Sequence, residues 1–266
     1  MAIIDAHAHI YPDKIAQRAV DSVRDFYGLG EMFCKEGTGQ ALIDAGQPAG
    51  ITHYLVHSVA VKAKTVESIN TFIAQQCAEH PEFVGFATMH QDYENPEAEI
   101  DRAKALGLHG VKLHPDTQRV NADDPRLMDV YEICQAKDMA VVLHTGDYRY
   151  DFSHPRRVVK ILRAFPDLRV NAAHFGGWSI YDIGADLLCG ENCYVDTCSS
   201  FELTGIRHGK ELINMYGRER VLFGSDFPMW SPAKELSMLR EMNFPQDVFE
   251  DLTWHNFERF AKVTLK

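Results

Sequence analysis

The chain has 266 residues, 45% of them hydrophobic, and a formal net charge of −11. This length is enough for a substantial core, and a single (β/α)8 barrel needs about 250 residues. Acidic and basic residues are mixed without a basic stripe, and no apolar run approaches the roughly 18 residues of a membrane span, so we expect neither nucleic acid nor a membrane as a partner.

Short apolar runs alternate with longer amphipathic segments along the whole chain. The runs predict eight strands, at 2–9, 51–57, 83–88, 109–114, 139–144, 168–174, 193–197 and 220–225. Helices are expected at 65–80, 95–106, 124–137, 155–164, 178–189, 204–215, 232–242 and 246–263. Strands that alternate with helices favour βαβ units and a parallel sheet.

Helix-start signals support this pattern. In "ENPEAEIDRAKALG", Asn95 is a candidate N-cap, Pro96 occupies the first helical position and Gly107 is a candidate C-cap. Eight βα units predict an α/β fold of the TIM-barrel type, in one domain over 1–266. A doubly wound open sheet is the alternative, but the segment after the first strand lacks the glycine-rich turn of that fold. We expect 10–50 to form an extended loop region beside the barrel mouth, with a short helix near 13–26.

The first strand carries polar residues at alternate positions. In "AIIDAHAH", strand alternation predicts that Ile3, Asp5, His7 and His9 share one face. Two histidines at i and i+2, near the carboxyl end of a barrel strand, direct their imidazoles toward one point. Zinc sites require such convergence of nitrogen ligands.

Other strands end in residues of the same kind. In TIM barrels the carboxyl ends of the strands meet at the active-site face. We therefore expect these residues to gather at one site, although each is also compatible with a structural role. They are His57, Lys112, His114, His144, His174 and, just past the last strand, Asp226.

The cysteines point to a reducing compartment. The chain has six cysteines, and none forms a CxxC pair. The cluster from Cys189 to Cys198 matches no zinc spacing. We expect reduced thiols in a cytoplasmic protein, because the chain begins with a strand pattern rather than a positively charged leader.

Four motifs in this order, "DAHAH", "VVLHTGD", "NAAHFGG" and "LFGSDFP", resemble the amidohydrolase superfamily. The similarity is greatest to its amidohydrolase-2 branch of compact barrels, which includes aminocarboxymuconate-semialdehyde decarboxylase and related aromatic-acid decarboxylases. It extends from residue 3 to the C-terminal "HNFERF".

The resemblance implies that His7, His9, His144 and Asp226 hold one divalent metal, most often zinc, with manganese, iron and cobalt as alternatives. It also implies that His174 acts as an acid and base, with Asp226 handling protons at the metal, and makes a homodimer a reasonable expectation.

Several residues keep more than one interpretation. Lys112 is either a carboxylated bridge between two metals, as in binuclear members of the superfamily, or a cation that lines the site for a substrate carboxylate; the compact branch favours one metal. Arg149 is either a carboxylate clamp or a solvated loop residue. His57 and His114 are candidate pocket residues. Asp5 is either an orienting partner of a ligand histidine or a structural residue.

The resemblance leads first to a metal-dependent hydrolase acting on an amide, ester or lactone of a small molecule. In that reading, water activated by the metal attacks the carbonyl carbon. The alternative is a non-oxidative decarboxylase of an unsaturated or aromatic acid, which would use nearly the same ligands. A barrel that binds a metal or a small ligand without catalysis is a third reading, although the complete set of candidate ligands argues against it.

Overall fold

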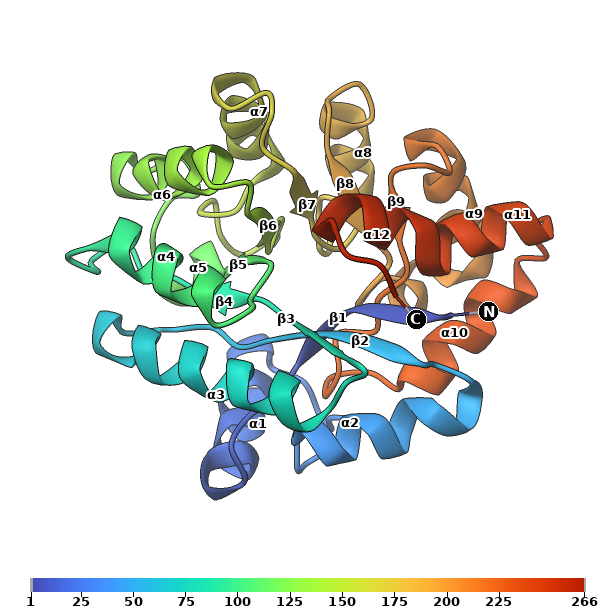
Figure 1. Cartoon of the computed structure of the whole chain (residues 1–266). Helices are drawn as coiled ribbons and strands as arrows, with labels where there is room; N and C mark the ends of the chain where they lie inside the picture. Colours follow the sequence, from blue (N-terminus) through green and yellow to red (C-terminus); the bar gives the residue numbers. More distant parts are fainter. Residues whose placement is uncertain (1, 266) are drawn as a thin grey trace.

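The structure is a computed structural model that describes residues 2–265. Helices surround a central ring of strands in Figure 1. The strands are β1 (Ile4–His9), β2 (His53–His57), β3 (Phe83–Gly85), β4 (Ala87–Thr88), β5 (Gly110–Leu113), β6 (Ala140–Leu143), β7 (Val170–Ala172), β8 (Tyr194–Asp196) and β9 (Val221–Leu222). Neighbouring strands pair in parallel, in the orders β1-β2-β3 and β4 to β9.

Backbone hydrogen bonds close the two arcs into an eight-unit barrel. The predicted strand 83–88 is interrupted at Phe86, whose amide donates to Val56 O at 3.0 Å and so keeps β3 and β4 in one wall. At the other junction, the Ala6 amide donates to Phe223 O at 2.8 Å and the Asp226 amide donates to His7 O at 2.8 Å. The expected TIM barrel is confirmed.

The outer helices agree closely with the sequence pattern. The Asn95 side chain accepts from the Ala98 amide at 3.4 Å at the start of α4, and Gly107 follows that helix with a φ of 85°. The helices are α3 (Val66–Glu79), α4 (Pro96–Ala105), α6 (Pro125–Ala136), α7 (Pro155–Ala164), α8 (Tyr181–Leu188), α9 (Phe201–Tyr216) and α10 (Pro232–Glu241). The expected last helix comprises α11 (Gln246–Glu250), a π-helical turn (Asp251–His255) and α12 (Asn256–Ala261).

The segment 10–50 differs from the expected extended loop because most of it is helical. It contains α1 (Asp13–Tyr27), which confirms the short helix expected near 13–26, and also α2 (Gly39–Gly46) and a short 3-10 helix (Gln47–Ala49). α1 buries Ala16 and Val20, and Val20 packs with Met32 and Met229 beside the barrel mouth. The short helices α5 (Pro115–Gln118) and η2 (Ala63–Thr65) were also not expected. None of the described helices is long and apolar enough to cross a membrane.

A bulge in β1 changes the expected alternation. The register against β2 shifts between Asp5 and Ala8. Ile4 and Ala6 pack with Leu55 and Phe260 in an apolar cluster, and Asp5 instead bonds to Ser225. The prediction that Asp5 shares a face with His7 and His9 fails here, because a bulge adds a residue and redirects the side chains beyond it.

Candidate metal centre and active site

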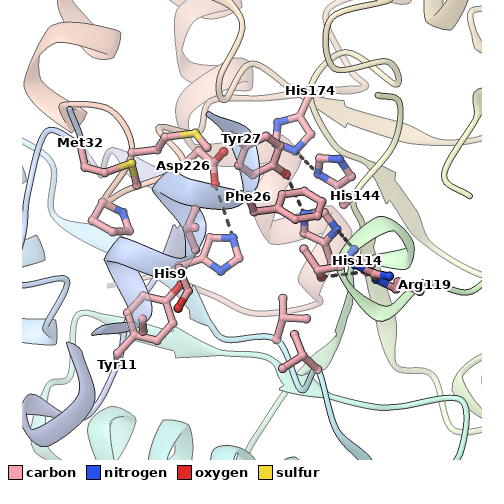
Figure 2. Close-up of a pocket in the computed structure, with 18 residues that line it drawn as sticks. His9, Tyr11, Phe26, Tyr27, Met32, His114, Arg119, His144, His174 and Asp226 are labelled. Carbon is pink, nitrogen blue, oxygen red and sulfur yellow. Dashed lines mark hydrogen bonds and ion pairs between the residues drawn. The ribbon is translucent and has the colours of Figure 1, made fainter. Parts of the chain in front are cut away.

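The carboxyl ends of the strands bring the candidate residues together. His7 and His9 come from β1, His57 ends β2, and Lys112 lies in β5. His144 directly follows β6, and His174 lies in the turn after β7. Asp226 lies in the loop after β9. Figure 2 shows His9, His144, His174 and Asp226 around one cavity. This gathering is the outcome expected for a parallel barrel.

His7, His9 and Asp226 form the first part of the site. Asp226 Oδ1 lies 3.4 Å from His9 Nε2 and 3.6 Å from His7 Nε2. The other oxygen of Asp226 accepts a hydrogen bond of 2.5 Å from Ser199 Oγ. One carboxylate oxygen therefore faces two imidazole nitrogens while its partner oxygen is anchored.

Asp196, at the end of β8, fixes the neighbouring histidines. Its Oδ2 lies 2.8 Å from His7 Nδ1 and accepts from Asn171 Nδ2 at 2.7 Å, and its Oδ1 accepts from the His174 amide at 2.8 Å. Since a carboxylate only accepts, His7 carries its hydrogen on Nδ1, and its Nε2 lone pair faces Lys112 Nζ at 2.9 Å, with Asp226 Oδ1 farther away at 3.6 Å. Sequence reasoning missed Asp196, although it ends a predicted strand like the residues that were chosen.

His144 and His174 form the second part. His144 Nε2 lies 3.0 Å from Gly146 O, and His174 Nδ1 lies 3.1 Å from Cys198 O. Each of these nitrogens faces a carbonyl acceptor and so carries its hydrogen. The two remaining nitrogens, His144 Nδ1 and His174 Nε2, face each other at 2.9 Å as lone pairs. Such a pair repels unless a proton or a cation is held there.

Burial keeps these histidines neutral. Desolvation is the largest cause that lowers the pKa of His7, His9, His57 and His144 well below the usual range, and the charge of Lys112 adds to it. Desolvation also lowers the pKa of His174, although Asp226 and Asp196 oppose that shift. Neutral imidazoles have the lone pairs that a metal requires.

The donor set fits a divalent metal. His7 and His9 present neutral nitrogens to a carboxylate, and Asp196 supplies the carboxylate–histidine contact that typically orients a ligand imidazole. His57 adds a buried imidazole whose two nitrogens have no hydrogen-bond partner among the described residues. His144 meets the cluster through His174, whose ring centroid lies 5.2 Å from that of His7.

The predicted substrate-binding residues occupy different places. His114 lines the cavity and stacks on His144 at a centroid distance of 3.8 Å. Lys112 is buried and is not among the residues that line the cavity. Its Nζ lies 2.9 Å from His7 Nε2, and desolvation lowers the pKa of Lys112. His57 is buried against the rings of His7 and His9.

Arg149 is already committed to other protein groups. Its guanidinium donates to Asp147 Oδ1 at 2.9 Å, to Asp147 Oδ2 at 2.7 Å and to Phe26 O at 2.6 Å. It also lies over four aromatic rings, at 5.0 to 5.7 Å from their centroids. These contacts make Arg149 a brace between its loop and α1 rather than a free carboxylate clamp.

The cavity has a volume of about 340 Å³ and is mostly apolar. Helix α1 forms one wall; the sequence predicted a helix near 13–26 but did not predict that it lines the cavity. The lining residues are His9, Tyr11, Ala19, Ser22, Val23, Phe26, Tyr27, Met32, Val59, Val61, His114, Thr117, Arg119, His144, His174, Asp226, Pro228 and Met229.

Tyr27 adds a hydroxyl to this cavity. His114 Nδ1 accepts from the Thr117 amide at 3.4 Å, so Nε2 carries the hydrogen and donates to the Tyr27 oxygen at 2.8 Å. The Tyr27 O–H is then free to donate into the cavity. Burial raises the pKa of Tyr27 well above its usual value, which keeps the hydroxyl protonated.

Known proteins share this fold. An uncharacterised TIM-barrel protein from Bordetella bronchiseptica superposes with a TM-score of 0.79 at 20% identity, covering 98% of this chain and 99% of that one. A dihydroxybenzoic acid decarboxylase from a Polaromonas species, with bound manganese and the inhibitor 2-nitroresorcinol, superposes with a TM-score of 0.73 at 18% identity, covering 98% and 97% of the two chains.

Sequence comparison gives the family. The chain is 26% identical over 207 residues to 2-amino-3-carboxymuconate-6-semialdehyde decarboxylase from Dictyostelium discoideum; the match covers 63% of this chain and 57% of that relative. The amidohydrolase family model matches residues 4–260, which is nearly the whole chain. The protein therefore belongs to the amidohydrolase family, in the amidohydrolase-2 branch of metal-dependent enzymes.

Proposed function

We propose that this protein is a metal-dependent, non-oxidative decarboxylase of an unsaturated or aromatic carboxylic acid. The sequence alone favoured hydrolysis and kept decarboxylation as the alternative. The relative from Dictyostelium and the manganese-bound neighbour are both decarboxylases, and they support the alternative better.

The lining of the cavity supports the proposal. It combines apolar side chains such as Val23, Phe26 and Met229 with polar groups that include His9, His174 and Asp226. A flat unsaturated acid would match this lining, with its hydrocarbon against the apolar side chains and its carboxylate toward the histidines. An apolar environment also solvates a carboxylate poorly, which favours its conversion to neutral CO₂.

The reaction needs a proton at one carbon. The bond from the substrate carbon to its carboxyl group breaks, the electron pair stays on that carbon, and a proton replaces the CO₂ that leaves. His174 lines the cavity, and its Nε2 can hold that proton, which leaves His144 Nδ1 to the metal. The Tyr27 hydroxyl is placed to donate a hydrogen bond to a substrate oxygen.

We propose His7, His9, His144 and Asp226 as the metal-holding residues, with zinc or manganese as the candidates. When bound, the metal supplies a positive charge that orients the acid and stabilises developing negative charge. His57 and Lys112 lie against His7, where they influence the ligand rather than line the cavity.

An isotope experiment tests the reaction type. The metal-loaded protein is incubated with a panel of hydroxybenzoic acids and unsaturated dicarboxylic acids, and with lactones and esters of such acids, in H₂¹⁸O and, separately, in D₂O. Decarboxylation gives CO₂, deuterium at the former carboxyl position and no ¹⁸O in the organic product. Hydrolysis of lactones or esters, with ¹⁸O in the product and no CO₂ from any acid, would overturn the proposal.

A further inference from the structure

One arginine at the cavity has no protein partner. Arg119 lines the cavity and is exposed, and its guanidinium forms no hydrogen bond or ion pair with any described residue. Every other arginine except Arg18 donates at least one hydrogen bond. Arg18 lies outside the cavity lining.

The backbone that carries Arg119 is firmly held. Arg119 caps α5 in the left-handed conformation, with φ 56°, and its amide donates to Pro115 O. The preceding Gln118 donates from Nε2 to Ala60 O at 2.9 Å and to Met89 O at 2.7 Å. Gln118 Oε1 also accepts from the His114 amide at 3.1 Å. The free guanidinium is therefore attached to a fixed point at the mouth.

The charges of the cavity lining make Arg119 its candidate anion-binding residue. Arg119 is the one lysine or arginine among the lining residues, and Asp226 is the one carboxylate. In Figure 2, Arg119 is drawn on the side of His114, across the view from Met32 and Tyr11. A guanidinium binds carboxylates with two parallel hydrogen bonds, and Arg149 cannot do so here because Asp147 already occupies it.

We propose that Arg119 binds a second carboxylate of the substrate, so that the preferred substrates are dicarboxylic unsaturated or aromatic acids. One carboxylate then faces the histidines, and the other is held at the mouth by Arg119. This inference rests on the proposed decarboxylase function for the role of the inner carboxylate.

Binding measurements test the inference without catalysis. Isothermal titration of the manganese-loaded protein compares benzene-1,3-dicarboxylate with benzoate, which lacks only the second carboxylate. We expect the dicarboxylate to bind about tenfold more tightly, as one charge-assisted contact at a partly exposed site allows. In R119Q this preference falls to about twofold, and R119K, which keeps the charge without the planar fork, lies between them.

R18Q is the matched control, since it removes an unpaired arginine that does not line the cavity; it should keep the wild-type preference. Circular dichroism checks that each variant is folded. An unchanged preference in folded R119Q, or no preference for the dicarboxylate in the wild type, including failure of both acids to bind, would overturn the inference. If every acid escapes decarboxylation while the Arg119-dependent preference persists, the reaction proposal fails and the anion site stands.

Discussion

Asp196 holds two histidines of the candidate site at once, through the His7 ring and the His174 amide. In D196N the residue keeps its shape but loses the charge that fixes the Nδ1–H form of His7. Groups that orient ligand histidines typically contribute 10- to 100-fold to metal affinity. We expect D196N to bind zinc at least tenfold more weakly than the wild type, measured by competition with a chromogenic chelator.

D138N is the control for this substitution, because Asp138 is itself exposed and pairs with Arg169 and Lys262, away from the candidate site. It should leave the zinc affinity unchanged. Equal affinities in D196N and the wild type would show that Asp196 does not support the metal ligands.

Glu235, at the start of α10, is buried, and its Oε2 has no hydrogen-bond partner. Desolvation, with the charges of Glu202 and Asp5, raises its pKa well above 4.5. The folded protein therefore holds a proton there that the unfolded chain releases above pH 4.5. Stability is lost as the pH rises through this window, by up to about 1.4 kcal/mol per pH unit.

E235Q removes this titration. We expect urea unfolding to show E235Q gaining stability relative to the wild type between pH 5 and pH 8. E241Q, in the last turn of the same helix, is the comparison for an exposed glutamate. A stability difference between E235Q and the wild type that is constant over this range would contradict the buried-acid interpretation.

At the scale of elements, the sequence predicts the polar ends of the strands well. The positions of His144, His174 and Asp226 follow from parallel pairing alone, because a parallel barrel brings all strand ends to one face. The orientation of the Asp5 side chain could not be predicted in this way. It depends on a bulge in β1, which arises from the register with β2 and is not visible in the alternation of polar and apolar residues. Tyr27 and Arg119 were missed for a related reason: α1 and α5 acquire their roles only when they close over the barrel mouth.

The start of β5 shows how tightly the barrel wall is packed. A Cβ at Gly110 would lie 2.3 Å from Phe86 Cε2 and 2.5 Å from the backbone oxygen of Ala140. The neighbouring backbone cannot move without disturbing the pairing of β5 with β6. We expect G110A to lower the free energy of unfolding by at least about 2 kcal/mol, within the range for overpacked cores, as measured by urea denaturation.

Gly190 provides the matched control. A Cβ there meets no atom within 4 Å, and its φ lies outside the left-handed region. G190A should change the free energy of unfolding by less than about 0.5 kcal/mol, as for ordinary surface positions. A G110A variant as stable as G190A would mean that β5 can shift away from Phe86.

At the scale of the whole molecule, a bound metal links strands that are distant in the sequence. The proposed ligands come from β1 and from the segments after β6 and β9, so binding requires the closed barrel. At a free metal concentration 1,000 times the dissociation constant, a single site stabilises the folded state by about 4 kcal/mol. We expect chelator-treated protein to unfold about 10 °C lower than protein at this free concentration of zinc or manganese, since each kcal/mol shifts Tm by about 2–4 °C at this size.

Calorimetric Tm and metal content measured on the same samples separate the remaining alternatives. D226N should lose most of the metal-dependent rise in Tm, whereas D138N should retain it. About one metal per chain would agree with an unmodified Lys112 whose contact with His7 Nε2, 2.9 Å in this structure, is replaced by the metal. About two would favour a carboxylated Lys112 as the bridge, because an unmodified ammonium cannot bridge two cations. Absence of both bound metal and a rise in Tm after reconstitution would refute the metal centre, since ligands from three strand ends would then have gathered without a cation to hold.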